Sequence, residues 1–380
     1  MSPSAGAKRR SPVRGGDATR PPSPTRAPSP VPSAPQAGSQ LVAETIIGLE
    51  DVARDEIVAH TRAIAFIVAP GEVRFSPTSD PRRALQLRTV QAVYSSATFA
   101  VPRPKALLGD VHFRRLGAQI DAALREWPAG TFRTIHIAAA GAESAVMRRL
   151  LSALATRTGL APDENEGDLL IRLRPDRAGG WETLVRLTAR PLATRTWRAQ
   201  NYPGALNAAV ASAMTRLLQP TARDVFVNLC CGSGSLLIER AAHGPAARLI
   251  GLDIASTALA LCRANLNAAG SGLAARVELI QADAGAAPLP DGSITTLCAD
   301  LPFGQQVGSH AANLTLYPAA LAEAARIAAP GARMGIISHE TRLMSDSLAR
   351  SPAWERVEER RISLNGIFPR IYLLRRVTAR

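Results

Sequence analysis

The chain has 380 residues, with 45 lysines and arginines against 31 acidic residues, which gives a formal net charge of +14. At roughly 150 residues per domain, this length predicts two or three domains. With 46% apolar and 20% charged residues, the composition excludes a fully disordered chain, a collagen-like chain and a disulfide scaffold. No apolar run reaches the roughly 18 to 20 residues that a membrane-spanning helix needs, so no membrane partner is expected.

The cysteines and histidines give no sign of a metal site or of a disulfide framework. The four cysteines lie in the second half of the chain without a Cys-x-x-Cys pair, and the six histidines include no His-x3-His spacing. Zinc ribbons and redox dithiols therefore lack sequence support. Free thiols in a reducing cytoplasm are expected. We expect a cytoplasmic monomer that binds no metal.

Residues 1–40 differ in composition from the rest of the chain. They hold nine prolines and seven serines and carry a charge of +5. Such a segment cannot bury enough apolar surface to offset the entropy lost on ordering. We expect a disordered basic tail, which either attracts polyanions weakly or is simply solvated chain.

Residues 41–200 are predicted to form a small α+β region in which short strands and helices alternate. The region carries 22 basic against 17 acidic residues. The expected strands are Leu41–Ile46, Ala63–Val68, Glu72–Phe75, Thr134–Ala138, Leu169–Leu173 and Trp181–Leu187, and the expected helices are Gly48–His60 and Ala142–Arg157.

From about Thr221 onward, short apolar strands alternate with Ala/Leu-rich helices. This alternation predicts βαβ units and a doubly wound, Rossmann-like parallel sheet with helices on both faces. The expected strands are Val225–Leu229, Arg248–Asp253, Val277–Gln281, Ile294–Asp300 and Arg333–Ser338. Two further segments, Arg361–Leu364 and Ile371–Arg375, predict a closing antiparallel hairpin.

The first candidate binding motif follows the first of these strands. Gly232-x-Gly234 leads directly into a helix, and small residues at such a turn let the backbone approach a nucleotide-like ligand closely. The third glycine of a dinucleotide fingerprint would fall at Leu237, and there is no phosphate-binding Gly-x4-Gly-Lys loop. The pattern favours S-adenosylmethionine over NAD or ATP, with an ordinary Gly-x-Gly turn as the alternative.

Two carboxylates at strand ends extend this candidate site. Asp253 ends the second strand, 19 residues after Gly234, where an acid can accept hydrogen bonds from both ribose hydroxyls. Asp253 could equally cap the next helix. Asp283 follows the third strand, where it could face an adenine amino group or merely start a turn. Their neighbours Ile254 and Ala284 are expected to border the same ligand.

The fourth strand ends in Asp300-Leu301-Pro302-Phe303. An amino group on a purine is a poor nucleophile because its lone pair is delocalised into the ring. A carboxylate at Asp300 and a backbone carbonyl at Leu301 or Pro302 can accept its hydrogen bonds, while Phe303 stacks on the base. The four residues resemble the [Asp/Asn]-Pro-Pro-[Tyr/Phe] motif of methyltransferases that act on exocyclic or amide nitrogens.

A wider resemblance is to the THUMP-containing tRNA guanine-N2-methyltransferases. It rests on motifs at residues 190–192, 198, 202–207, 300–304, 307–309, 316–318, 329–331 and 365–369. The resemblance implies a ferredoxin-like subdomain over residues 41–130, a THUMP RNA-binding domain over 131–200 and a methyltransferase domain over 201–380. Two positions depart from the family pattern: Asn228 replaces an aspartate near the cofactor, and Leu301 replaces a proline.

These observations lead to one main hypothesis, an S-adenosylmethionine-dependent methylation of guanosine N2 in the acceptor stem of tRNA. The resemblance implies a target around position 6. The alternatives are methylation of rRNA guanine, DNA adenine or protein amide nitrogens, and a catalytically inactive RNA-binding protein. The expected catalytic residues are Asp300, Leu301, Pro302 and Phe303. The expected cofactor-binding residues are Asn228, Cys231, Gly232, Gly234, Asp253, Ile254, Asp283, Ala284 and Asp300. The expected RNA-binding residues are Arg103, Lys105, Arg172 and Arg174.

Overall fold

The structure is a computed structural model that describes Met1 and residues 40–77, 80–200, 202, 204–303, 309–364 and 366–377. The tail expected over residues 1–40 therefore lies almost wholly outside the described residues. So do the motif residues Pro203 and Asn365 and the stretch 304–308. None of the helices in the described ranges has the length and apolar character that crossing a membrane requires.

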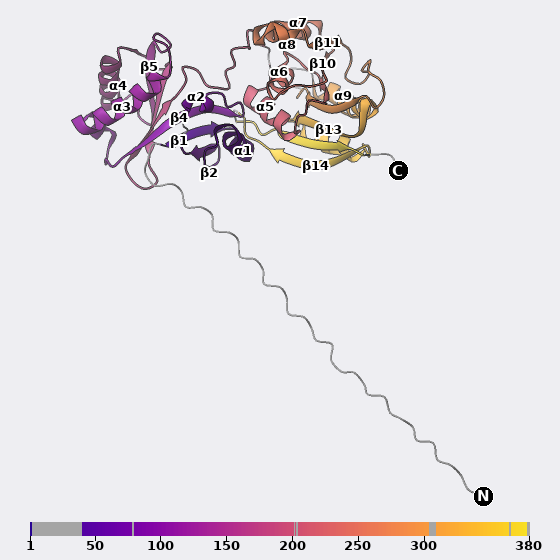
Figure 1. The fold of residues 1–380 in the computed structure, drawn as a ribbon, viewed down its shortest axis with the longest axis horizontal. Coiled ribbons are helices and arrows are strands. Elements are labelled where there is room, and N and C mark those ends of the chain that lie inside the picture. Colours follow the sequence, from indigo (N-terminus) through magenta and orange to yellow (C-terminus); the bar gives the residue numbers. More distant parts are fainter. Residues whose placement is uncertain are drawn as a thin grey trace. The chain divides into compact units, whose positions relative to one another are not determined.

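The N-terminal region is built on one eight-stranded sheet with the strand order β2-β3-β1-β4-β8-β7-β5-β6. Figure 1 draws this region in indigo to magenta. Its strands are β1 (Gln40–Thr45), β2 (Ala65–Ala69), β3 (Glu72–Phe75), β4 (Val90–Phe99), β5 (Thr134–Ala139), β6 (Ala161–Pro162), β7 (Leu169–Pro175) and β8 (Trp181–Arg186). Its helices are α1 (Glu50–Thr61), α2 (Pro81–Ala84), α3 (Asp110–Arg125) and α4 (Ala145–Thr158), with a short 3-10 turn, η1 (Pro104–Leu108). All six strands and both helices expected here are present.

Strand β4 joins the two halves of this sheet. It pairs antiparallel with β1 on one side and with β8 on the other. The hydrophobic core divides along the same strand, because Val93 packs with α1 whereas Phe99 packs with α3 and α4. The domain boundary expected at residue 130 stays a prediction. Helix α3, which precedes that boundary, packs with residues that follow it.

The C-terminal region contains a seven-stranded sheet with the order β11-β10-β9-β12-β13-β15-β14. Strands β9 (Val225–Leu229), β10 (Arg248–Asp253), β11 (Val277–Gln281), β12 (Ile294–Asp300) and β13 (Ala328–Ser338) are parallel. Strands β14 (Trp354–Arg361) and β15 (Arg370–Arg376) close the sheet antiparallel. This is the expected Rossmann-like sheet with a terminal hairpin.

The first strand of that hairpin was wrongly placed at Arg361–Leu364, because β14 ends at Arg361. Strand β14 lies at the edge of the sheet and carries six charged residues among its eight, so it lacks the alternation of apolar and polar residues used to predict strands. Charged side chains are common on edge strands because they prevent pairing with other chains.

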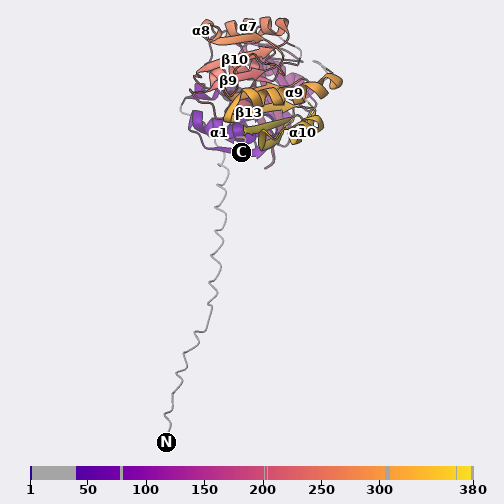
Figure 2. The same ribbon diagram turned by 90° about the vertical axis from the view of Figure 1, so that its right-hand side faces the viewer.

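Helices cover both faces of the C-terminal sheet, as expected. Helices α5 (Ala208–Leu217), α6 (Ser235–Ala242) and α7 (Ser256–Ala269) contribute to one hydrophobic cluster, and α9 (His310–Ile327) and α10 (Thr341–Ala349) to another. The short α8 (Ser271–Ala274) follows α7, which packs against β10 and β11 (Figure 2).

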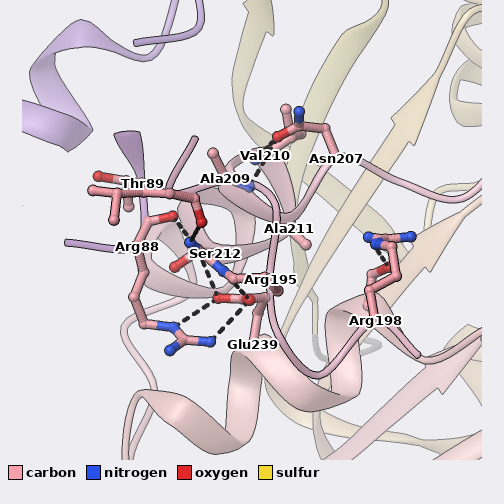
Figure 3. Close-up of polar contacts among 12 residues, drawn as sticks. Arg88, Thr89, Arg195, Arg198, Asn207, Ala209, Val210, Ala211, Ser212 and Glu239 are labelled. Atoms are coloured by element: carbon pink, nitrogen blue, oxygen red, sulfur yellow. Dashed lines mark hydrogen bonds and ion pairs between the residues drawn. The ribbon is translucent and has the colours of Figure 1, made fainter. Parts of the chain in front are cut away.

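The two regions share buried contacts. Ile46, Leu49 and Val52, at and around the start of α1, belong to the same hydrophobic cluster as Trp197 and Met214. A polar contact between the regions centres on Glu239 of α6. This residue is fully buried and accepts hydrogen bonds from Arg88 and Arg195 (Figure 3). Helix α6 is therefore tied to the loop between α2 and β4.

Candidate active site

A cavity of about 360 Å³ lies at the carboxyl ends of the parallel strands. It borders β9 and β12, between which the strand order reverses, and such a reversal is where open α/β sheets bind ligands. The structure brings eleven expected site residues to this cavity: Asn228, Cys231, Gly232, Asp253, Ile254, Asp283, Ala284, Asp300, Leu301, Pro302 and Phe303. Tyr202 and Ser235 also line it. Tyr202 begins the 202–207 motif, which was noted without a role at the site, and Ser235 was missed because it lies in no recognised motif.

The loop after β9 turns in left-handed backbone conformations. Cys230, Gly232 and Gly234 have φ values of +52°, +52° and +88°. A side chain at Gly232 would point toward the Tyr202 ring, 3.7 Å away. Gly234 was expected to contact the cofactor, but its own Cβ position lies 2.6 Å from the Cys262 sulfur. Gly234 therefore fits the loop against α7 and does not line the cavity.

Asp253 holds that loop in place. Its Oδ2 accepts a hydrogen bond from the Gly232 N–H at 2.8 Å, and its Oδ1 accepts one from the Ala255 N–H at 3.0 Å. Helix α7 is capped by Ala255, so the helix-cap alternative for Asp253 is not what the structure shows. A carboxylate oxygen has further lone pairs, which leaves Asp253 able to accept ribose hydroxyls at the cavity.

Asp283 combines the two roles considered for it. Its Oδ1 accepts a hydrogen bond from the Gly285 N–H at 2.8 Å, which closes a turn after β11. The residue nevertheless lines the cavity beside Ala284. A ligand on this side would therefore meet a carboxylate already fixed by its own turn.

Asn228 is buried on β9 with half of its amide satisfied. Its Nδ2 donates to the carbonyls of Leu229 and Cys298 at 3.1 and 3.3 Å. Its buried Oδ1 has no hydrogen-bond partner among the described residues. Buried acceptors are rarely left unpaired in proteins, so this atom points to a donor supplied by a ligand.

Asp300 at the end of β12 is the second such acceptor. Within the described part of the chain its buried Oδ1 has no partner, and desolvation raises the pKa of Asp300 to about 7. A carboxylate in this state favours a nearby cation or N–H donor. Together, Asn228 and Asp300 suit a cofactor that carries a positive charge and an amine that brings N–H donors.

The cysteines beside the loop do not behave as nucleophiles. Burial raises the pKa of Cys230 to about 12, so its thiol stays protonated at neutral pH. All four cysteines are free. No group of three His, Cys, Asp or Glu side chains able to hold a metal occurs in the ranges the structure describes.

The turn from Asp300 to Phe303 is held by side chains from α9 and from the end of β13. The Pro302 carbonyl accepts hydrogen bonds from Asn313 and Tyr317, and the Phe303 ring meets the His339 ring edge-on at a centroid distance of 4.4 Å. Asn313 was missed by the sequence analysis. Tyr317 lies in the Leu316-Tyr317-Pro318 motif, which was noted without a role.

The four residues expected to bind RNA fall into two groups. Arg172 pairs with Glu44 at 3.0 Å and lies over the Tyr94 ring, and Arg174 pairs with Glu72 and Glu182. Arg103 and Lys105 are exposed at η1, and neither forms an ion pair with any residue that the structure describes.

A comparison with protein families decides the class of the C-terminal region. Residues 195–369 match the family described as the RMKL-like methyltransferase domain. The expected methyltransferase domain is thus confirmed, and with it S-adenosylmethionine as its cofactor.

Several curated relatives that match this region are named as guanine-N2-methyltransferases of RNA. The tRNA (guanine(6)-N(2))-methyltransferase THUMP3 of Bos taurus is 29% identical over 187 residues, which cover 46% of this chain and 37% of that protein. The U6 snRNA (guanine-N(2))-methyltransferase THUMPD2 of Bos taurus is 33% identical over 109 residues, 29% of this chain and 21% of that protein. The matches thus span little more than a third of THUMP3 and about a fifth of THUMPD2. They confirm the resemblance to THUMP-containing methyltransferases.

Among solved structures, TrmN from Thermus thermophilus shares both regions. It superposes with a TM-score of 0.71 at 25% identity, covering 90% of this chain and all of that chain. The N-terminal sheet is therefore part of the shared fold, together with the methyltransferase domain.

Proposed function

We propose that this protein transfers the methyl group of S-adenosylmethionine to N2 of a guanosine in the acceptor stem of tRNA. The observation that carries the proposal is the Asp300 carboxylate, which lines the cavity together with Phe303 and whose buried Oδ1 has no hydrogen-bond partner among the residues that the structure describes. The activities that the THUMP3 and THUMPD2 relatives are named for support guanine N2 as the acceptor. The bovine THUMP3 name supports tRNA and its position 6.

The chemistry requires that the amine's lone pair be drawn out of the purine ring. Asp300 accepts one N–H of the target amine and a backbone carbonyl accepts the other, which localises the lone pair on nitrogen and aims it in line with the methyl group. Phe303 stacks on the base. S-adenosylmethionine supplies an electrophilic methyl on a sulfonium.

The methylated amine must then lose a proton. Because burial places the pKa of Asp300 near 7, the same carboxylate is matched to accept that proton at neutral pH. Asp253 and Asp283 would hold the nucleoside end of the cofactor, and the Asn228 Oδ1 would accept a donor from the rest of it.

The target guanosine must leave its helix to reach this cavity, which costs a few kcal/mol that contacts with the RNA backbone offset. Arg103 and Lys105 are free to make such contacts, whereas Arg172 and Arg174 would first have to leave their ion pairs. We place the reaction in the cytoplasm, with the chain acting as a monomer. The four free cysteines support a reducing compartment.

The test is methyl transfer to separate pools. Purified protein is incubated with labelled S-adenosylmethionine and tRNA, rRNA, DNA or protein, and the labelled tRNA is digested for nucleoside mass spectrometry. N2-methylguanosine in tRNA is expected, with Asp300→Asn as the inactive control. Label on DNA or protein alone would refute the proposal, and so would RNA binding by a protein that calorimetry shows not to bind the cofactor.

A further inference from the structure

The turn from Asp300 to Phe303 has two backbone carbonyls, those of Leu301 and Pro302, that could orient the target amine. One of them already accepts hydrogen bonds from the protein itself. The Pro302 carbonyl accepts a hydrogen bond from Asn313 Nδ2 at 2.7 Å and another from the Tyr317 hydroxyl at 2.9 Å. A carbonyl oxygen has two lone pairs. Both are taken, so Pro302 has none left for a substrate.

Both donors are built into the interior of the domain. Asn313 and Tyr317 are fully buried, and they lie four residues apart on α9, which places them on the same face of the helix. Asn313 Nδ2 also lies 3.3 Å from Glu340 Oε1, at the end of β13. The position of the turn is thus set by α9 and β13, which are elements outside β12.

The direction of each hydrogen bond around Tyr317 is fixed. The Glu340 N–H donates to Ser338 Oγ at 3.0 Å, and Ser338 Oγ lies 2.8 Å from the Tyr317 hydroxyl oxygen. Because the single hydroxyl hydrogen of Tyr317 goes to Pro302, Ser338 must donate to Tyr317. Burial raises the pKa of Tyr317, which keeps this donor protonated.

We infer that Asn313 and Tyr317 are positioning residues for methyl transfer: they saturate the Pro302 carbonyl, assign the second amine hydrogen bond to the Leu301 carbonyl, and fix the turn that carries Asp300 and Phe303. This inference rests on the proposed function and deepens it. The His339 ring, in edge contact with Phe303, supports the same turn from the end of β13.

The test separates positioning from binding. In Tyr317→Phe the ring remains and one donor to Pro302 is lost, so kcat should fall about tenfold while the KM values for cofactor and tRNA stay within about twofold. Asn313→Leu removes the other donor at similar volume and should act in the same way. The double variant should lose about a hundredfold in kcat.

A matched control is available in Tyr372→Phe. Tyr372 is a buried tyrosine of the same hydrophobic cluster, and its hydroxyl lies 3.5 Å from the Thr341 carbonyl, away from the turn. Its kcat should equal that of the wild type. Cofactor affinity by calorimetry and the thermal midpoint are measured for every variant.

Wild-type kcat in both Tyr317→Phe and Asn313→Leu would overturn the inference, as would a loss of cofactor affinity that matches the loss of kcat in both. If one variant fails to fold, the other still decides. Failure of the proposed function looks different, because the wild type itself would then transfer no methyl group to RNA.

Discussion

Arg88 and Glu239 lie 151 positions apart in the sequence and are joined by two hydrogen bonds, from Nε to Oε2 at 2.8 Å and from Nη2 to Oε1 at 2.9 Å (Figure 3). Arg195 adds a third contact to the same carboxylate at 2.9 Å. Burial by itself would raise the pKa of Glu239, but the guanidinium groups of Arg195 and Arg88 outweigh it and hold that pKa below its usual value. The carboxylate is therefore ionised in the folded protein.

Replacing Glu239 by alanine should destabilise the protein by about 3–5 kcal/mol, because two arginines then lose the partner of a buried ion pair. Urea denaturation measures this loss. The control is Glu278→Ala, which breaks an ion pair with Arg248 whose two side chains are each half exposed; it should cost less than about 1 kcal/mol. Equal losses in the two variants would contradict the prediction.

Asp300→Asn should abolish turnover and at the same time stabilise the protein at pH 8. The pKa of Asp300 is raised from 3.8 to about 7, so between these pH values the folded state keeps a proton that the unfolded state has lost. Wild-type stability should therefore fall relative to the variant as pH rises from about 4 to 7, by on the order of 2–4 kcal/mol, and stay level above that. Thermal melts across this range test it, and parallel pH profiles of the two proteins would exclude it.

Cofactor binding should release a proton near neutral pH. The positive sulfonium of S-adenosylmethionine favours the ionised form of Asp300, so affinity should increase as pH rises through about 7. S-adenosylhomocysteine lacks that charge and should show a weaker dependence. Calorimetry in buffers of different ionisation enthalpy counts the released protons; Asp300→Asn should release none from this position, and an unchanged count would rule out the linkage.

Gly234→Ala should destabilise the domain by about 1–3 kcal/mol. The new Cβ would lie 2.6 Å from the Cys262 sulfur at a backbone φ of +88°. Removing the sulfur in the double variant with Cys262→Ala should recover part of the loss, which a double-mutant cycle of unfolding free energies measures. Strict additivity would show that backbone strain alone causes the effect.

The exposed cations at η1 should contribute more to RNA affinity than the paired cations of β7. Arg103→Ala and Lys105→Ala should each weaken tRNA binding and lower the slope of log affinity against log salt by about 1. Arg172→Ala should change little, because its charge is already compensated by Glu44. Filter binding between low and moderate salt distinguishes these cases, and a larger loss from Arg172→Ala would reverse the assignment.

Much of the C-terminal sheet could be predicted from sequence because each parallel strand is a short apolar run with a polar residue at its end. Strands β9, β10, β11 and β12 have the expected bounds, and the acids that end or follow three of them all reach the cavity. In contrast, β4 and α3 were not predicted. Strand β4 mixes serines and alanines with its aliphatic residues and is defined by its pairing with β1 and β8, which lie far away in the sequence.

Within the site, the sequence could predict which residues line the cavity. It could not predict which of their atoms are already engaged by other parts of the protein. The sequence indicated that Leu301 or Pro302 would offer a carbonyl, but only the placement of α9 shows which of the two is engaged. Gly234 illustrates the same limit. A glycine in a ligand-binding loop leaves room for close contact with a cofactor or with another part of the protein. Here the Cys262 side chain makes that close contact.

The common cluster of Leu49 and Val52 with Met214 has a practical meaning for anyone who wishes to divide or recombine this protein. A fragment starting near residue 200 would expose the apolar surface that α1 now covers, and such fragments tend to aggregate. Chimeras that replace the N-terminal region should therefore keep α1 together with the methyltransferase domain.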